Sequence, residues 1–240
     1  MPGLHYEGWP VFMRNDPVSD RYWPSLYTTF ADFQIVFYDD TDRVIAVGHS
    51  IPVVWDGTVE GLPSRWDLLL EQGIHDHERH HAPTTLSALA LVIAKSHRGQ
   101  DLSSKVIREM KSVAAKHSLT ALIAPVRLTL KSRYPLTPME HYVQWKQADG
   151  SPFDPWLRVH WKLGAEFLCI AHQFFVITGT VAEWEEWTEM RFPQSGAYIV
   201  PGALQPVVID CEQNQGSYEE ANVWMRHPIT VSDATPKAKL

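Results

Sequence analysis

Residues 84–117 read TTLSALALVIAKSHRGQDLSSKVIREMKSVAAKH, and this stretch decides the fold. Its first part, 84–95, is an apolar run that follows a proline and contains β-branched residues, which predicts a buried strand. From Leu102 onward, apolar residues recur at helical spacing with charges between them, which predicts an amphipathic helix. A strand that enters a helix through a polar turn containing glycine presents free backbone N–H groups at the positive end of the helix dipole. The stretch therefore predicts an anion site, and a phosphate ester is the usual occupant of such a site.

The polar turn carries a resemblance to a known family. RGQDLS, residues 98–103, resembles the acyl-CoA pyrophosphate loop of the GCN5-related N-acetyltransferase superfamily, whose pattern is Arg/Gln-x-x-Gly-x-Gly/Ala. Arg98 and the small Ser103 fit, whereas Asp101 stands where the family has its central glycine. A carboxylate there repels a diphosphate, and its side chain can cap the helix N–H groups that the phosphate would use. On residues alone, a polar turn capped by Asp101 is the alternative.

A second segment carries the same resemblance. VHWKLGAEF, residues 159–167, is similar to the family's Phe-Tyr-x-Lys-x-Gly-Phe segment, in which a tyrosine four residues before the glycine faces the cofactor sulfur. His160 holds the place of that tyrosine, and Gly164 is the glycine. An imidazole with a pKa near ~6.5 serves as acid or base close to neutrality. The alternative is a packed core histidine on the helical face of Trp156 and Leu163.

The resemblance implies the fold: an α/β (α+β) acyl-CoA N-acyltransferase fold with a mixed, mostly antiparallel sheet flanked by helices. Two runs, 33–38 and 44–54, are joined by a short polar turn and predict a hairpin before the central strand. A further buried strand is expected at 119–126, splayed from the central one so that the pantetheine arm lies between them. We expect one domain over 1–240, with insertions near 55–83 and 130–153 and a C-terminal extension near 180–230.

Several helix boundaries are predicted from capping residues. The helix in the first insertion starts near Ser64 and stops at Gly73, followed by a solvated loop with four histidines, in which we expect no metal. The second insertion starts a helix at Thr137 that runs to about 147. Asp154 followed by a proline starts the helix that carries His160. Shorter elements are a helix over 20–29, strands over 174–178, 198–200, 206–210 and 218–224, and a helix opened by the capping box at 180–183.

The resemblance also assigns roles to residues. Acetyl-CoA or another acyl-CoA is the co-substrate, and the strand segment 91–93 holds the acyl group through its backbone. His160 is the acid at the sulfur, and Thr129 lies at the mouth of the splay. Trp23 or Tyr27 walls the acceptor pocket, although a buried aromatic is more often plain core. The residues assigned to the cofactor are Val92, Ile93, Arg98, Gly99, Gln100, Asp101, Leu102 and Ser103.

Two other functions stay open. The loading domains of some polyketide synthases share the acetyltransferase fold, decarboxylate malonyl-CoA and pass the acyl group to a carrier-protein thiol by means of a His and a Thr. His160 and Thr129 fit those roles by placement, with Trp23 near the acyl pocket. The third function is a non-catalytic CoA-binding or interaction module, which Asp101 favours. The acceptor is accordingly an amine or a thiol, on a small molecule or a carrier protein.

Composition and charge limit the kinds of partner and the location expected for this protein. The net charge of −7 and the lack of a long basic run exclude nucleic acid as a general partner. A local basic patch between 95 and 111 surrounds the polar turn and suits an anionic cofactor. Two cysteines are too few for a disulfide scaffold, and no segment reads as a membrane span or a signal peptide. We expect a soluble cytoplasmic protein, and a homodimer is left open.

Overall fold

The computed structural model of the chain describes residues 4, 8–14, 17–230 and 233. Eight strands form one sheet in the order β1-β2-β3-β4-β8-β7-β6, and β5 pairs with β8 off this path. Only β3 and β4 run parallel, while every other pair is antiparallel. The expected mixed, mostly antiparallel sheet is confirmed. The strands are β1 (Ile35–Tyr38), β2 (Val44–Val53), β3 (Thr85–Ile93), β4 (Ala121–Val126), β5 (Glu166–Gly179), β6 (Gly196–Tyr198), β7 (Val207–Asp210) and β8 (Gln215–Pro228).

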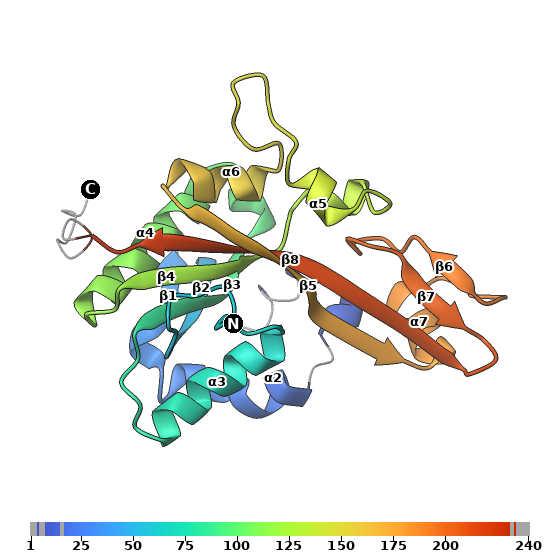
Figure 1. Cartoon of the computed structure of the whole chain (residues 1–240), viewed down its shortest axis with the longest axis horizontal. Coiled ribbons are helices and arrows are strands. Elements are labelled where there is room, and N and C mark those ends of the chain that lie inside the picture. Colours follow the sequence, from blue (N-terminus) through green and yellow to red (C-terminus); the bar gives the residue numbers. More distant parts are fainter. Residues whose placement is uncertain (1–3, 5–7, 15–16, 231–232, 234–240) are drawn as a thin grey trace.

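Helices flank both faces of this sheet (Figure 1). α4 and α6 cover one face, and α2 and α3 cover the other. Within the described residues, five short 3-10 helices lie between the longer elements. The α-helices are α2 (Pro17–Tyr22), α3 (Trp66–Glu78), α4 (Leu102–Lys116), α5 (Met139–Tyr142), α6 (Pro155–Lys162) and α7 (Val181–Thr188). The 3-10 helices are η1 (Val11–Met13), η2 (Trp23–Tyr27), η3 (Ala31–Phe33), η4 (Lys95–His97) and η5 (Lys131–Arg133).

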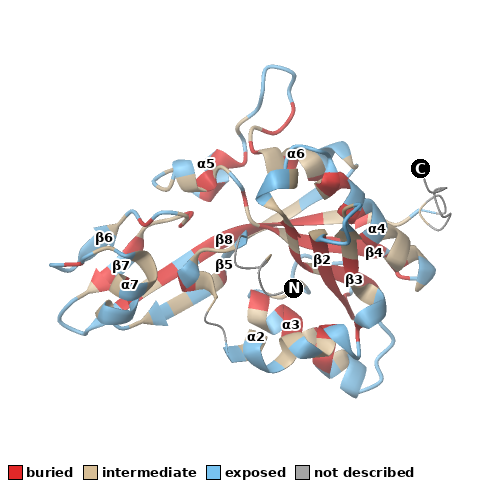
Figure 2. Cartoon of the chain, turned by 180° about the vertical axis from the view of Figure 1, so that it is seen from behind, coloured by how far each residue is buried: buried red, intermediate tan, exposed pale blue. Residues whose placement is uncertain are grey.

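Two glycines let helices approach the sheet closely. A Cβ on Gly48 of β2 would lie 2.5 Å from Val106 of α4. On the opposite face, a Cβ on Gly73 of α3 would lie 2.5 Å from Ile51 of β2. Contacts this short are not tolerated in packed cores, so each glycine sets the distance between its helix and the sheet. Figure 2 shows the buried residues concentrated on β2, β3 and β4, between these two helical layers.

The two central strands separate as expected. β3 and β4 pair only through Thr85↔Ala121, Leu86↔Leu122 and Ser87↔Ile123. Beyond that point β3 continues along β2 as far as Ile93, and β4 continues along β8 as far as Val126. Each strand stays paired with its outer neighbour, so a gap opens between β3 and β4 beyond Ser87 and Ile123.

Several boundaries differ from the sequence-based predictions. α3 does not stop at Gly73 but runs to Glu78, because this glycine serves packing rather than capping. The helix expected from Thr137 to 147 is only α5, and its N-cap is Pro138. The N-terminal helix lies at Pro17–Tyr22 and continues as the 3-10 helix η2. β5 and β8 are each 14 residues long, far longer than predicted, because each is paired along its length with the other.

One buried carboxylate ties the far end of β4 to α6. Asp154 accepts hydrogen bonds from Trp156 N at 2.8 Å and from Leu130 N at 2.9 Å. It also accepts from Tyr142 Oη at 3.0 Å and from Thr129 N at 3.3 Å. The predicted N-cap of α6 is thus confirmed. The same side chain fixes the loop after β4, which carries Thr129.

Replacing Asp154 with alanine is expected to lower the free energy of unfolding by about 2–4 kcal/mol, because a helix cap is lost and buried donors are left unpaired. Urea denaturation followed by tryptophan fluorescence measures the change. Asp154→Asn keeps the shape and one acceptor oxygen and should lose roughly half as much. An alanine variant within about 0.5 kcal/mol of the parent would contradict the role given to this carboxylate.

Candidate active site

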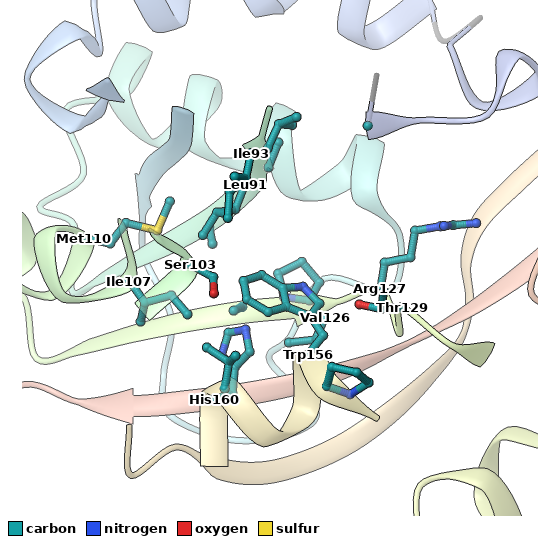
Figure 3. Close-up of a pocket in the computed structure, with 18 of the residues that line it drawn as sticks. Leu91, Ile93, Ser103, Ile107, Met110, Val126, Arg127, Thr129, Trp156 and His160 are labelled. Atoms are coloured by element: carbon teal, nitrogen blue, oxygen red, sulfur yellow. The ribbon is translucent and has the colours of Figure 1, made fainter. Parts of the chain in front are cut away.

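A cavity of about 510 Å³ occupies the gap between β3 and β4 (Figure 3). Its walls come from β3, β4, α4 and α6 and from residues Gly8 and Trp9 near the N-terminus. Most of the residues assigned to the cofactor and the chemistry meet here, although they come from β3, the turn before α4, α4, the loop after β4, and α6. Those that line it are Val92, Ile93, Arg98, Gly99, Ser103, Thr129 and His160. Gln100, Asp101, Leu102 and Trp23 are not among the described lining residues.

The turn before α4 contains two residues with positive φ. Gly99 has a φ of +80°, and Asp101 has a φ of +58°, in the left-handed region that favours glycine. Arg98 Nε donates to the carbonyl of Ile93 at 3.2 Å, which holds the turn against the end of β3. The main chain at Asp101 therefore adopts a conformation that glycine reaches more easily than aspartate does.

The carboxylate of Asp101 does not cap the helix, so that expectation is wrong. α4 has no side-chain cap at its N-terminus. Asp101 Oδ1 instead accepts a hydrogen bond from Ser104 Oγ, and Oδ2 lies 3.6 Å from Arg108 Nη1. The left-handed backbone turns the side chain toward these partners and away from the first-turn N–H groups. The carboxylate therefore pairs with Arg108 of the basic patch and leaves the helix N-terminus uncapped.

His160 projects from α6 into the cavity beside Trp156, with ring centroids 4.9 Å apart (Figure 3). The side chain is buried, and its Nδ1 lies 2.9 Å from Nε2 of His227 on β8. Burial, and secondarily the charge of His227, hold the pKa of His160 well below its usual value of 6.5. His160 is therefore uncharged at neutral pH and can either donate or accept one proton.

His227 is the partner that sequence reasoning missed. It is fully buried, and burial lowers its pKa to about 4, with Lys111 acting in the same direction. It lies 67 residues from His160 in the chain, at the end of a strand predicted too short. The pairing of β8 with β4 and with β5 brings it beside α6, and no local pattern in the sequence reports these pairings.

The cavity wall beyond Thr129 contains a buried ion pair. Arg127 Nε and Nη2 each lie 2.8 Å from a carboxylate oxygen of Glu220 on β8. The same Nη2 donates to the carbonyl of Gly202 at 2.8 Å, and Tyr218 Oη donates to Glu220 at 2.6 Å. Burial alone would lower the pKa of Arg127, but the Glu220 carboxylate outweighs it and raises the pKa. The charge of Arg127 is thus neutralised within the wall.

Trp23 lies in the layer of α2 and α3, away from the lining of this cavity. Its ring stacks on Trp66 with centroids 6.0 Å apart and meets His49 edge-on at 5.0 Å. His49 is buried on β2, and its Nδ1 lies 2.9 Å from Gln34 Oε1. Both readings of Trp23, as an acceptor wall or as core, stay predictions.

Among the residues that the structure describes, no group of three or more His, Cys, Asp or Glu side chains is arranged to hold a metal ion. Within the same residues, no helix combines the length and the apolar character needed to cross a bilayer.

The chain is similar in sequence and in fold to known proteins. No family model matches the chain. Arginine N-acetyltransferase avaD from Aspergillus versicolor is 34% identical over 249 residues, covering 92% of this chain and 85% of that protein. Among solved structures, the loading GNATL domain of CurA from Lyngbya majuscula superposes with a TM-score of 0.60 at 15% identity, covering 95% of this chain and 90% of that one. The GphF GNAT-like decarboxylase in complex with isobutyryl-CoA gives a TM-score of 0.59 at 16% identity, with 92% and 89% covered. With the predicted fold present, and with a relative of this identity over nearly its whole length, the chain belongs to the GCN5-related N-acetyltransferase superfamily and is an acyltransferase that uses an acyl-CoA as co-substrate.

Proposed function

We propose that the chain transfers an acetyl group from acetyl-CoA to a nitrogen of arginine or of a closely related guanidino compound. The observation that carries this proposal is the relative named as an arginine N-acetyltransferase, because its similarity extends over 92% of the chain rather than over a motif. Acceptors often change between distant superfamily members, so the acceptor is tested directly below.

The cavity supports a donor orientation from the turn to the reacting centre. Arg98, Gly99 and Ser103 line one part of it, where α4 begins and its dipole favours a pyrophosphate. Beyond Ser87 the backbone of β3 no longer pairs with β4, so its N–H and C=O groups on that side are available to the amides of the pantetheine arm. A main-chain N–H of this segment would also stabilise the oxyanion that forms when the thioester is attacked.

His160 supplies the proton transfers in this proposal. The acceptor nitrogen loses a proton to solvent and then attacks the thioester carbonyl through its lone pair, and a tetrahedral intermediate forms with a positive charge on nitrogen. The uncharged imidazole takes one proton from that nitrogen. It then returns the proton to the sulfur as the C–S bond breaks, so N-acetylated product and free CoA leave with all protons accounted for. The lowered pKa of His160 keeps the accepting form populated at neutral pH.

A second function follows from one specific observation. His160 and Thr129 line the same cavity, the pair expected for decarboxylation of malonyl-CoA and transfer to a carrier-protein thiol. The two solved structures with TM-scores near 0.6 are named as a loading domain and a decarboxylase, yet at 15–16% identity they support the fold alone. We keep this as the alternative acceptor chemistry, with a carrier protein as partner.

We expect an acceptor panel to separate the two. With acetyl-CoA, arginine should release free CoA and give a product 42 Da heavier by mass spectrometry, roughly the mass of one acetyl group replacing one hydrogen. Citrulline has nearly the same shape without the cation and should react at least about 10-fold more slowly, since a site built for a charged group rejects its neutral isostere. Release of carbon dioxide from malonyl-CoA without any acceptor, together with no acetylated guanidino product, would favour the alternative.

His160→Gln tests the proton-transfer role. Glutamine is polar and similar in size but does not titrate, so turnover should fall by a factor on the order of 10²–10⁴. The melting temperature should stay near that of the parent, and titration with CoA should give an unchanged dissociation constant. A packing residue would behave in the opposite way, with an early melt and nearly normal turnover per folded molecule. In the parent, the acid limb of the pH–rate profile should lie below pH 6.5, because burial lowers the pKa of His160 and protonation removes the accepting nitrogen.

Asp101→Gly should tighten CoA binding by about 1 kcal/mol, roughly a 5-fold lower dissociation constant. The glycine adopts φ +58° without strain, and the change releases Arg108 and removes a negative charge beside the pyrophosphate. Asp101→Asn is the matched control, because it tolerates the left-handed region and removes only the charge. Isothermal titration compares the three proteins, and weaker binding in the glycine variant would assign Asp101 a positive role in recognition.

A further inference from the structure

Two buried histidines form a pair behind the reacting end of the cavity. His160 comes from α6 and His227 from β8, and their rings lie 5.1 Å apart between centroids. His160 Nδ1 and His227 Nε2 are 2.9 Å apart, a hydrogen-bond distance for two ring nitrogens. Both pKa values are lowered, so both rings are neutral at pH 7 and each carries one proton.

The direction of this hydrogen bond decides what His160 offers to the cavity. If His160 Nδ1 donates, its only proton is used there, and Nε2 is left as an acceptor. If His227 Nε2 donates instead, the proton of His160 sits on Nε2, and the ring is a donor. The tautomer of His227 therefore fixes the catalytic form of His160.

Several groups near His227 act on the pKa of its ring. Nδ1 is buried and makes no well-formed hydrogen bond to any described residue, but the main chain of Leu163 stabilises a proton on this ring. Asp233 acts in the same direction, while Lys111, which pairs with Asp233 at 3.1 Å, opposes it. In its proposed role, His160 needs Nε2 free to accept a proton, so the one proton of this neutral ring lies on Nδ1. His227 Nε2 is then an acceptor, and His160 Nδ1 must donate to it.

We propose that His227 is a positioning residue that holds His160 in the Nδ1–H tautomer, with Nε2 unprotonated and directed at the acceptor nitrogen. This inference rests on the proposed role of His160 at the reacting atoms. His160 Nε2 accepts the proton from the attacking nitrogen, and the resulting imidazolium is held by its Nδ1–H···Nε2 bond to His227. The proton then passes from Nε2 to the departing thiolate, and the pair returns to its starting state.

The test compares His227→Leu, which removes the acceptor, with His227→Gln, whose side-chain amide presents an oxygen near the position of the ring Nε2. Nitrogen-15 NMR of the histidine-labelled full chain reports which ring nitrogen of His160 carries the proton, whether or not any acceptor is turned over. We expect Nε2 of His160 to be unprotonated in the parent and in the Gln variant, and Nε2–H to appear in the Leu variant. His172→Gln, on an exposed histidine of β5 outside the pair, is the control and should change neither signal nor rate.

Kinetics complete the test. His227→Leu should lower kcat by a factor of about 10–10² with KM for acetyl-CoA unchanged, and His227→Gln should recover most of that loss even if both variants melt at the same temperature. A parent enzyme with Nε2 of His160 protonated would overturn the proposal, as would a Leu variant with unchanged tautomer and kcat. No turnover with any guanidino acceptor would refute the proposed function, while the NMR result would still decide the role of His227.

Discussion

The candidate active-site cavity exists because β3 and β4 stop pairing partway along their length. Their parallel ladder ends at Ser87↔Ile123, after three residue pairs, while β2 and β8 hold the outer edges for the full length of each strand. Parting two central strands inside a sheet leaves backbone donors and acceptors without ladder partners, and such groups are costly unless something binds them. The cavity is therefore a site that favours a polar, amide-containing occupant, and the pantetheine arm of an acyl-CoA has that chemistry.

The candidate residue His160 lies in the gap because α6 is fixed beside it, and Asp154 holds α6 in that position. One carboxylate caps α6 and also binds the backbone at Thr129, so the two candidate residues are placed by the same buried group. A hydrogen bond to a charged acceptor is stronger than a neutral one, and several donors sharing one oxygen pair restrict each other's positions. The relative placement of His160 and Thr129 is thus a property of the scaffold and does not depend on a bound ligand.

The sequence predicted those parts of the site that local patterns encode. The strand, turn and helix over 84–117 and the capped start of α6 depend on neighbouring residues, and the structure confirms them. The motif predicted the position of Asp101 in the turn. It did not predict the left-handed backbone conformation that directs the carboxylate toward Ser104. His227 was out of reach, because its partner lies 67 residues away and only strand pairing joins them. Gly73 gave a wrong prediction of the helix end, because glycine occurs both at helix ends and where a helix packs closely against a sheet.

The ion pair in the cavity wall shows how a buried charge can specify shape without adding much stability. Removing two charges from water costs several kcal/mol, so a buried pair is worth little unless every remaining donor and acceptor is matched. Here the matching groups come from one loop: Gly202 accepts from Arg127, and Leu204 both accepts from Lys131 and donates to Tyr218. Each of these contacts would be lost if the loop moved, and Arg127 and Lys131 would each lose one buried hydrogen-bond acceptor. The charges therefore fix the 202–204 loop against β4 and β8, and the cavity wall that contains Arg127 is held in one arrangement.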